Sequence, residues 1–177
     1  MNKIVIVEDK LKRGISLAEQ FEEFSNEYPE LELETADICF FQPDLEAADK
    51  IIRNVGDCPF LIKPVSLLNF NKIMDEYLYN LDSRTFLIID FILDDDGSRG
   101  VPIRRINIRY ARNNNRVDTN QLWFYTGTGI LNEQILGELV GEEHVFDILK
   151  VDEEHLRLNL NKDSFIAALT DSENCEV

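Results

Sequence analysis

The chain has few positive charges, few cysteines and no long apolar run. Its 177 residues include 34 Asp and Glu but only 18 Lys and Arg, which gives a formal net charge of −16. Such a negative field repels nucleic-acid phosphate and anionic membranes, so we expect neither as a direct partner. The longest apolar stretches, such as 85–93, are too short to cross a bilayer. The three cysteines are an odd number without metal-ligand spacing, which predicts reduced thiols in a cytoplasmic protein.

The remaining composition is that of a folded globular protein. Hydrophobic residues make up 44% of the chain and aromatic residues 10%, which argues against disorder. At this length we expect one domain over 1–170, followed by a polar tail at 171–177. The span 41–84 holds one helix more than a simple alternation of strands and helices needs. We interpret it as an inserted helical segment within the domain.

Strand-like and helix-like segments alternate along the chain. Apolar or alternating runs predict strands at 3–7, 31–41, 85–89, 121–125 and 145–149. Apolar residues at helical spacing predict helices at 10–28, 44–55, 66–81, 131–140 and 152–169, the last with a candidate break at 159–161. The segment 102–113 could also be a helix, although its apolar residues fit either the helix or the strand period. Asp44 is a candidate cap for the helix at 44–55. This alternation predicts an α/β protein with a parallel sheet flanked by helices.

Four of the predicted strands end in a polar or charged residue. Glu8 and Asp9 follow the first strand, Asp90 follows the strand at 85–89, Thr126 follows 121–125 and Lys150 follows 145–149. The carboxyl ends of parallel strands open onto one crevice, so we expect these side chains to lie close together. Three carboxylates there could hold a hard cation such as Mg²⁺. Asp90 could act as a nucleophile toward a phosphoryl group, whose oxygens the hydroxyl and the ammonium could bind.

Together these segments resemble the receiver domain of two-component response regulators. The residues that carry the resemblance are Lys-Ile-Val-Ile-Val-Glu-Asp-Lys at 3–10, Phe-Leu-Ile-Ile-Asp-Phe-Ile-Leu at 86–93, Trp-Phe-Tyr-Thr-Gly at 123–127 and Asp-Ile-Leu-Lys at 147–150. The resemblance implies a five-stranded, flavodoxin-like parallel sheet. It also implies a stand-alone signalling domain that takes a phosphoryl group from a histidine kinase or phosphotransfer protein and then acts on a downstream protein effector, with a homodimer left open.

The resemblance also assigns roles by position. It implies that Mg²⁺ is bound by Glu8, Asp9, the Asp90 side chain and the Ile92 carbonyl. Asp90 would be the phosphoacceptor, while Thr126 and Lys150 would sense and hold the phosphoryl group. Transfer to Asp90 and the later loss of the group would be self-catalysed, so the chain would not be an enzyme acting on a separate substrate.

The chain departs from the receiver pattern at several positions. Val151 follows Lys150 where receivers usually have a proline, and Asp147 stands at a position that is often aromatic. Asp9 and Asp90 are 81 positions apart, more than receivers usually have. The inserted segment contains Lys63 followed by proline, which is an alternative candidate for the active lysine. These departures keep open a receiver-like interaction module that is not phosphorylated.

A different metal-binding family matches part of the same pattern. The first strand ending in Glu8, together with the acids at 94–96, also resembles the Toprim fold of nucleases, primases and topoisomerases. That resemblance implies Mg²⁺-dependent work on nucleic-acid phosphates. It gives Thr126 and Lys150 no role, and the net charge of −16 opposes binding to nucleic acid.

Overall fold

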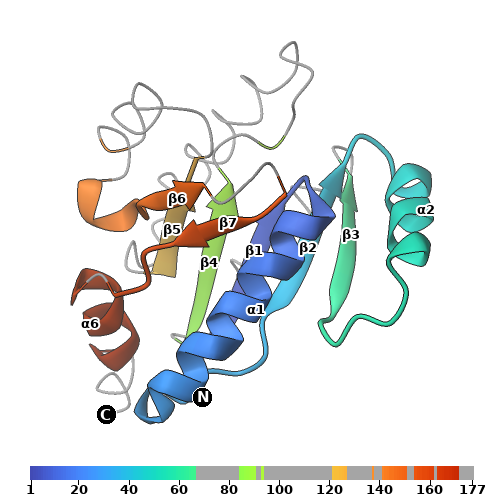
Figure 1. Cartoon of the computed structure of the whole chain (residues 1–177). Coiled ribbons are helices and arrows are strands. Elements are labelled where there is room, and N and C mark those ends of the chain that lie inside the picture. Colours follow the sequence, from blue (N-terminus) through green and yellow to red (C-terminus); the bar gives the residue numbers. More distant parts are fainter. Residues whose placement is uncertain are drawn as a thin grey trace.

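The computed structural model describes residues 1–66, 84–90, 93, 121–126, 137, 141–150, 154–161 and 163–171, the side chain of Lys150 excepted. In chain order the elements are β1 (Lys3–Glu8), α1 (Leu11–Glu27), the 3₁₀ turn η1 (Pro29–Leu31), β2 (Asp37–Gln42), α2 (Leu45–Val55), β3 (Ile62–Ser66), β4 (Thr85–Asp90), β5 (Leu122–Tyr125), the 3₁₀ turn η3 (Glu142–His144), β6 (Ile148–Lys150), β7 (Leu156–Leu158) and α6 (Asp163–Asp171). Figure 1 shows their arrangement.

The main sheet has five parallel strands in the order β3-β2-β1-β4-β5. Strand β1 lies at its centre, and Ile4 to Val7 have no exposed surface. A β-branched run suits this position because a parallel strand covered on both faces needs apolar side chains on each side. The α/β class with a parallel sheet flanked by helices is therefore confirmed.

The strand order contains the flavodoxin-like arrangement with one strand added. Beyond β5, Val145 forms a parallel bridge with Phe124, and the Phe146 amide donates to the Phe124 carbonyl at 2.8 Å. If β3 is set aside and this fifth segment is counted, the order of strands along the chain is 2-1-3-4-5, as in flavodoxin-like folds. Strand β3 extends the sheet beyond β2 at the opposite edge.

The inserted span therefore contributes more than helix. Within its described part, α2 is followed by β3, which pairs in parallel with β2. The predicted helix at 44–55 is confirmed, and the Asp44 side chain caps it by accepting from the Ala47 amide at 2.7 Å. Strand β3 was not predicted. Pro64 lies within it, and β3 is the outermost of the described strands on this side, a position that tolerates proline because an edge strand pairs on one side only.

Two predictions near the carboxyl terminus are wrong in part. The segment predicted as the fifth strand joins the main sheet only around Val145, and β6 then pairs antiparallel with β7. The helix predicted from residue 152 starts at Asp163, because residues 156–158 form a strand with Leu156 and Leu158 buried and Arg157 exposed. The strand predicted at 31–41 is likewise shorter. Residues 29–31 form a 3₁₀ turn, and the strand begins only at Asp37.

One face of the sheet packs against α1 and α6. The Phe165 ring of α6 lies 6.1 Å from that of Phe21 on α1, 6.3 Å from that of Phe86 on β4 and 5.0 Å from that of Trp123 on β5. Figure 1 shows α1 and the β6–β7 hairpin on this same side. Among the described helices, none combines the length and the apolar character needed to span a membrane. The predicted helices at 66–81 and 102–113 lie outside the described residues, as does nearly all of the one at 131–140.

Candidate metal centre

Three of the sequence-predicted residues meet at the carboxyl edge of the sheet. Val7 pairs with Ile89, so Glu8 and Asp90 are the next residues on the neighbouring strands β1 and β4. One carboxylate oxygen from each of Glu8, Asp9 and Asp90 lies within 4.8 Å of the other two. Their convergence follows from two parallel strands that end at the same level.

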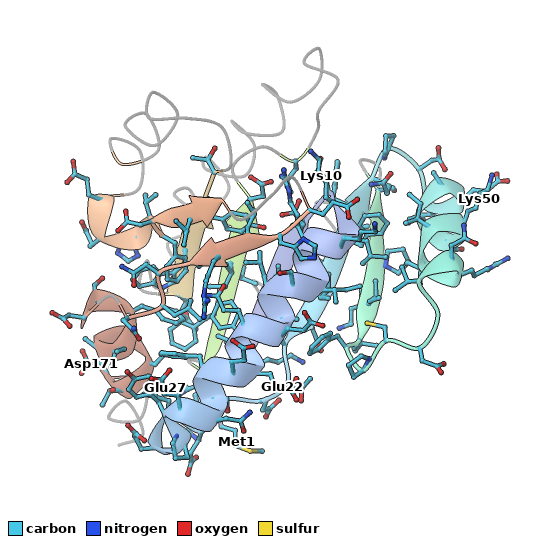
Figure 2. The ribbon with its side chains drawn as sticks, viewed as in Figure 1. Met1, Lys10, Glu22, Glu27, Lys50 and Asp171 are labelled. Carbon is cyan, nitrogen blue, oxygen red and sulfur yellow. The ribbon has the colours of Figure 1, made fainter. Side chains whose placement is uncertain are left out.

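Glu8 is held by hydrogen bonds on both carboxylate oxygens. Its Oε1 accepts the backbone amides of Asp9 and Lys10, each at 3.0 Å, and its Oε2 accepts the Tyr125 hydroxyl at 2.6 Å. Figure 2 labels Lys10 directly before α1, at the end of the helix that lies near the carboxyl ends of the strands. The turn between β1 and α1 is also tied to β2, because the Gln42 side chain donates to the Asp9 carbonyl at 2.8 Å.

Close packing of α1 removes Glu8 from solvent. Gly14 of α1 lies over the strand ends, where an added Cβ would be 3.0 Å from Ile38 Cγ2 and 3.7 Å from Glu8 Cβ. Glu8 itself has no exposed surface, and Asp90 is 3% exposed. A side chain at position 14 would press against the Ile38 methyl group, so glycine suits this close approach of α1 to the sheet.

Burial and neighbouring acids set the electrostatics of the site. The pKa of Glu8 lies well above its usual value, first because burial removes the carboxylate from water, then because of the negative charge of Asp90, with Asp9 adding to the rise. The hydrogen bond from Tyr125 acts in the opposite direction. The pKa of Tyr125 is also raised, by burial first and by the charge of Glu8 second.

The residues present fit a hard divalent cation. The donor set consists of three carboxylates, and the two neighbouring charges that act on Glu8 both disfavour its ionised form. A cation would offset this repulsion, and Mg²⁺ binds in proteins through one or a few carboxylates while keeping several waters. A buried acidic cluster that could hold a metal is therefore present, as predicted.

The remaining predicted site residues are described to different extents. Thr126 is buried and follows Tyr125, whose register partner is Asp90, so its backbone lies at the same edge of the sheet. Lys150 is the last residue of β6. Four residues later in the chain, Glu154 forms an ion pair with Lys12, at the start of α1, at 2.8 Å. Position 92 lies outside the described residues, as do the acids at 94–96.

Lys63 is excluded as the active lysine. Its Nζ lies 3.5 Å from Asp37 Oδ2, which also pairs with Lys3 at 3.0 Å. Asp37 and Lys3 begin β2 and β1, at the amino edge of the sheet. The Lys63 side chain therefore extends away from the acidic cluster.

Tyr125 is the site residue that the sequence analysis missed. The sequence analysis assigned it only to a buried strand. Tyr125 lies two residues after Trp123, so both side chains are on the same face of β5. A buried tyrosine hydroxyl usually has a hydrogen-bond partner, so the position beside a predicted acidic site was a usable signal.

Comparisons of the chain with protein-family models, curated proteins and solved structures found no match.

Proposed function

We propose that the chain is a receiver-like signalling domain that accepts a phosphoryl group on Asp90 in a Mg²⁺-dependent reaction. The observation that supports this most is the meeting of Glu8, Asp9 and Asp90 at the carboxyl edge of a parallel sheet, with Asp90 on the strand next to the acidic pair. The flavodoxin-like order within that sheet is consistent with the proposal.

The proposed step transfers a phosphoryl group from a nitrogen or oxygen atom of the donor to a carboxylate oxygen of Asp90. An Asp90 carboxylate oxygen attacks phosphorus, an acyl phosphate forms, and the bond from phosphorus to the leaving group breaks. The leaving group keeps the electron pair of the broken bond. It is the imidazole when phosphohistidine is the donor and acetate when acetyl phosphate is the donor. Bound Mg²⁺ would supply charge neutralisation. Glu8 and Asp9 hold their carboxylates beside Asp90, and Thr126 and Lys150 are proposed to bind the phosphoryl oxygens.

The proposal extends to partners and location. A histidine kinase or phosphotransfer protein would donate the group, and a downstream protein would respond to the phosphorylated form. Both would meet the chain in the cytoplasm. The response would be a shift between two conformations, because a phosphoryl group stabilises whichever arrangement of the strand-end loops binds it better.

Labelling with radioactive acetyl phosphate tests the proposal. The wild-type chain should take up label in Mg²⁺ and lose it when EDTA is added beforehand, and Asp90→Asn should take up none. Asp49→Asn, at an exposed position on α2, is the matched control and should be labelled like the wild type. Label retained in Asp90→Asn would refute the assignment. An unlabelled wild type that still binds Mg²⁺ would favour the interaction module instead.

A further inference from the structure

Tyr125 makes a contact that the proposed reaction does not require. Its hydroxyl reaches Glu8 Oε2 at 2.6 Å, and its side chain is completely buried. We propose that Tyr125 is a positioning residue of the metal site, which fixes the Glu8 carboxylate so that only one lone pair is left for a cation. This inference rests on the proposed metal function and specifies how one of its ligands is held.

The hydrogen bonds around Glu8 limit how it can bind a metal. An ionised carboxylate has about four lone-pair positions, two on each oxygen. The amides of Asp9 and Lys10 occupy both positions on Oε1, and the Tyr125 hydroxyl occupies one on Oε2. Glu8 can therefore contribute one oxygen, or one hydrogen bond to a metal-bound water, but not both oxygens at once.

The contact spans the full width of the site. Tyr125 ends β5, Asp90 ends β4 and Glu8 ends β1, and these strands are consecutive in the sheet. Neighbouring strands are about 4.8 Å apart, so β1 and β5 are separated by about 10 Å. Only two long side chains can meet across that distance. Tyr125 thus connects the two strands that flank the strand carrying the phosphoacceptor.

Removal of the hydroxyl should weaken metal binding. Without it, Oε2 loses a donor at a position that water does not reach, so the ionised carboxylate becomes less favourable and its orientation less fixed. Loss of such an outer-shell hydrogen bond typically lowers metal affinity about 10- to 100-fold. Tyr125→Phe keeps the aromatic ring and removes only the oxygen, so the strand and its packing should be retained.

Calorimetric titration with MgCl₂ measures this effect. We expect the dissociation constant of Tyr125→Phe to rise about 10-fold above that of the wild type. Tyr28→Phe is the matched control, because Tyr28 packs against Phe24 near the far end of α1, and its affinity should equal that of the wild type. Equal affinity of Tyr125→Phe and the wild type overturns the inference while the proposed function stands. A wild type that binds no Mg²⁺ overturns both.

A double-mutant cycle separates positioning from general structural support. If Tyr125 acts through Glu8, Tyr125→Phe should cause no further loss of affinity in a Glu8→Gln background. An equal loss in both backgrounds overturns the inference. In the wild type, the Cζ resonance of isotope-labelled Tyr125 should shift as Mg²⁺ saturates the site, and an unchanged resonance during saturation also overturns it. This last measurement does not depend on the folding of any variant.

Discussion

Among single residues, Glu8 carries a high electrostatic cost within the described structure. It is fully buried, lies beside two other acids, and has a pKa well above its usual value, chiefly because of burial. The positions of Glu8, Asp9 and Asp90 could be predicted because the carboxyl ends of parallel strands lie at the same edge of the sheet. The position of Tyr125 beside this site made it a candidate, but its contact with Glu8 could not be predicted, because alternation along a strand predicts burial and not which side chain lies two strands away.

The raised pKa of Glu8 predicts a pH dependence of stability. Its folded-state pKa exceeds the value of 4.5 expected without burial, so the folded protein binds more protons than the unfolded chain between these two values. Stability from this group is therefore present below pH 4.5 and is lost as the pH rises through the folded pKa. In metal-free buffer, the free energy of unfolding of Glu8→Gln should increase relative to that of the wild type by about 1 kcal/mol per pH unit between these two pKa values.

Urea unfolding at a series of pH values checks this. The difference in free energy of unfolding between Glu8→Gln and the wild type should grow with pH in favour of the variant. Glu19→Gln, at an exposed position on α1, should show no such trend. A difference that stays constant with pH would show that Glu8 is ionised at little cost in the folded protein.

Among the elements, the β6–β7 hairpin is hydrogen-bonded to α1 through the Gln20 side chain. Gln20 donates from Nε2 to the Leu158 carbonyl at 2.5 Å and accepts the Leu158 amide on Oε1 at 3.0 Å. Sequence patterns did not reveal this hairpin, because Leu156, Leu158 and Leu160 suit a short strand while neighbouring apolar residues also suit a helix. Over so few residues the two periods cannot be separated.

Loss of the Gln20 side chain should loosen the hairpin. Gln20→Ala leaves the amide and carbonyl of Leu158 without this partner, and an unsatisfied buried group typically costs about 1–3 kcal/mol. We expect a lower free energy of unfolding in urea and faster hydrogen exchange at the Leu158 amide. Glu19→Ala, on the exposed side of the same helix, is the control. Equal exchange of the Leu158 amide in the two variants would contradict the role given to Gln20.

At the scale of the whole molecule, an excess of acids and a buried acidic cluster predict stabilisation by a divalent cation. The flavodoxin-like order of the central strands was implied by the resemblance to receiver domains, and the structure contains it. Strand β3 could not be predicted from the sequence, because Pro64 argues against a strand. Only the tertiary structure shows that β3 is the outermost of the described strands on its side of the sheet.

Ligand linkage gives the size of this stabilisation. A cation that binds only the folded protein adds about 2.7 kcal/mol when present at about 100 times its dissociation constant. Thermal unfolding of the wild type should therefore shift upward in MgCl₂, beyond the shift in NaCl of matched ionic strength. Asp9→Asn should lose most of the extra shift, while Asp49→Asn should keep it. The same extra shift in Asp9→Asn would place the stabilising ions elsewhere on the acidic surface.

A Mg²⁺ titration followed by amide NMR tests the central claim most directly, because the amides of Asp9 and Lys10 both donate to Glu8. The account predicts saturable shifts at these two amides and at Asp90, all described by one dissociation constant. Shifts that do not saturate, or that arise only at exposed acids while these amides remain unchanged, would contradict a metal site formed by Glu8, Asp9 and Asp90.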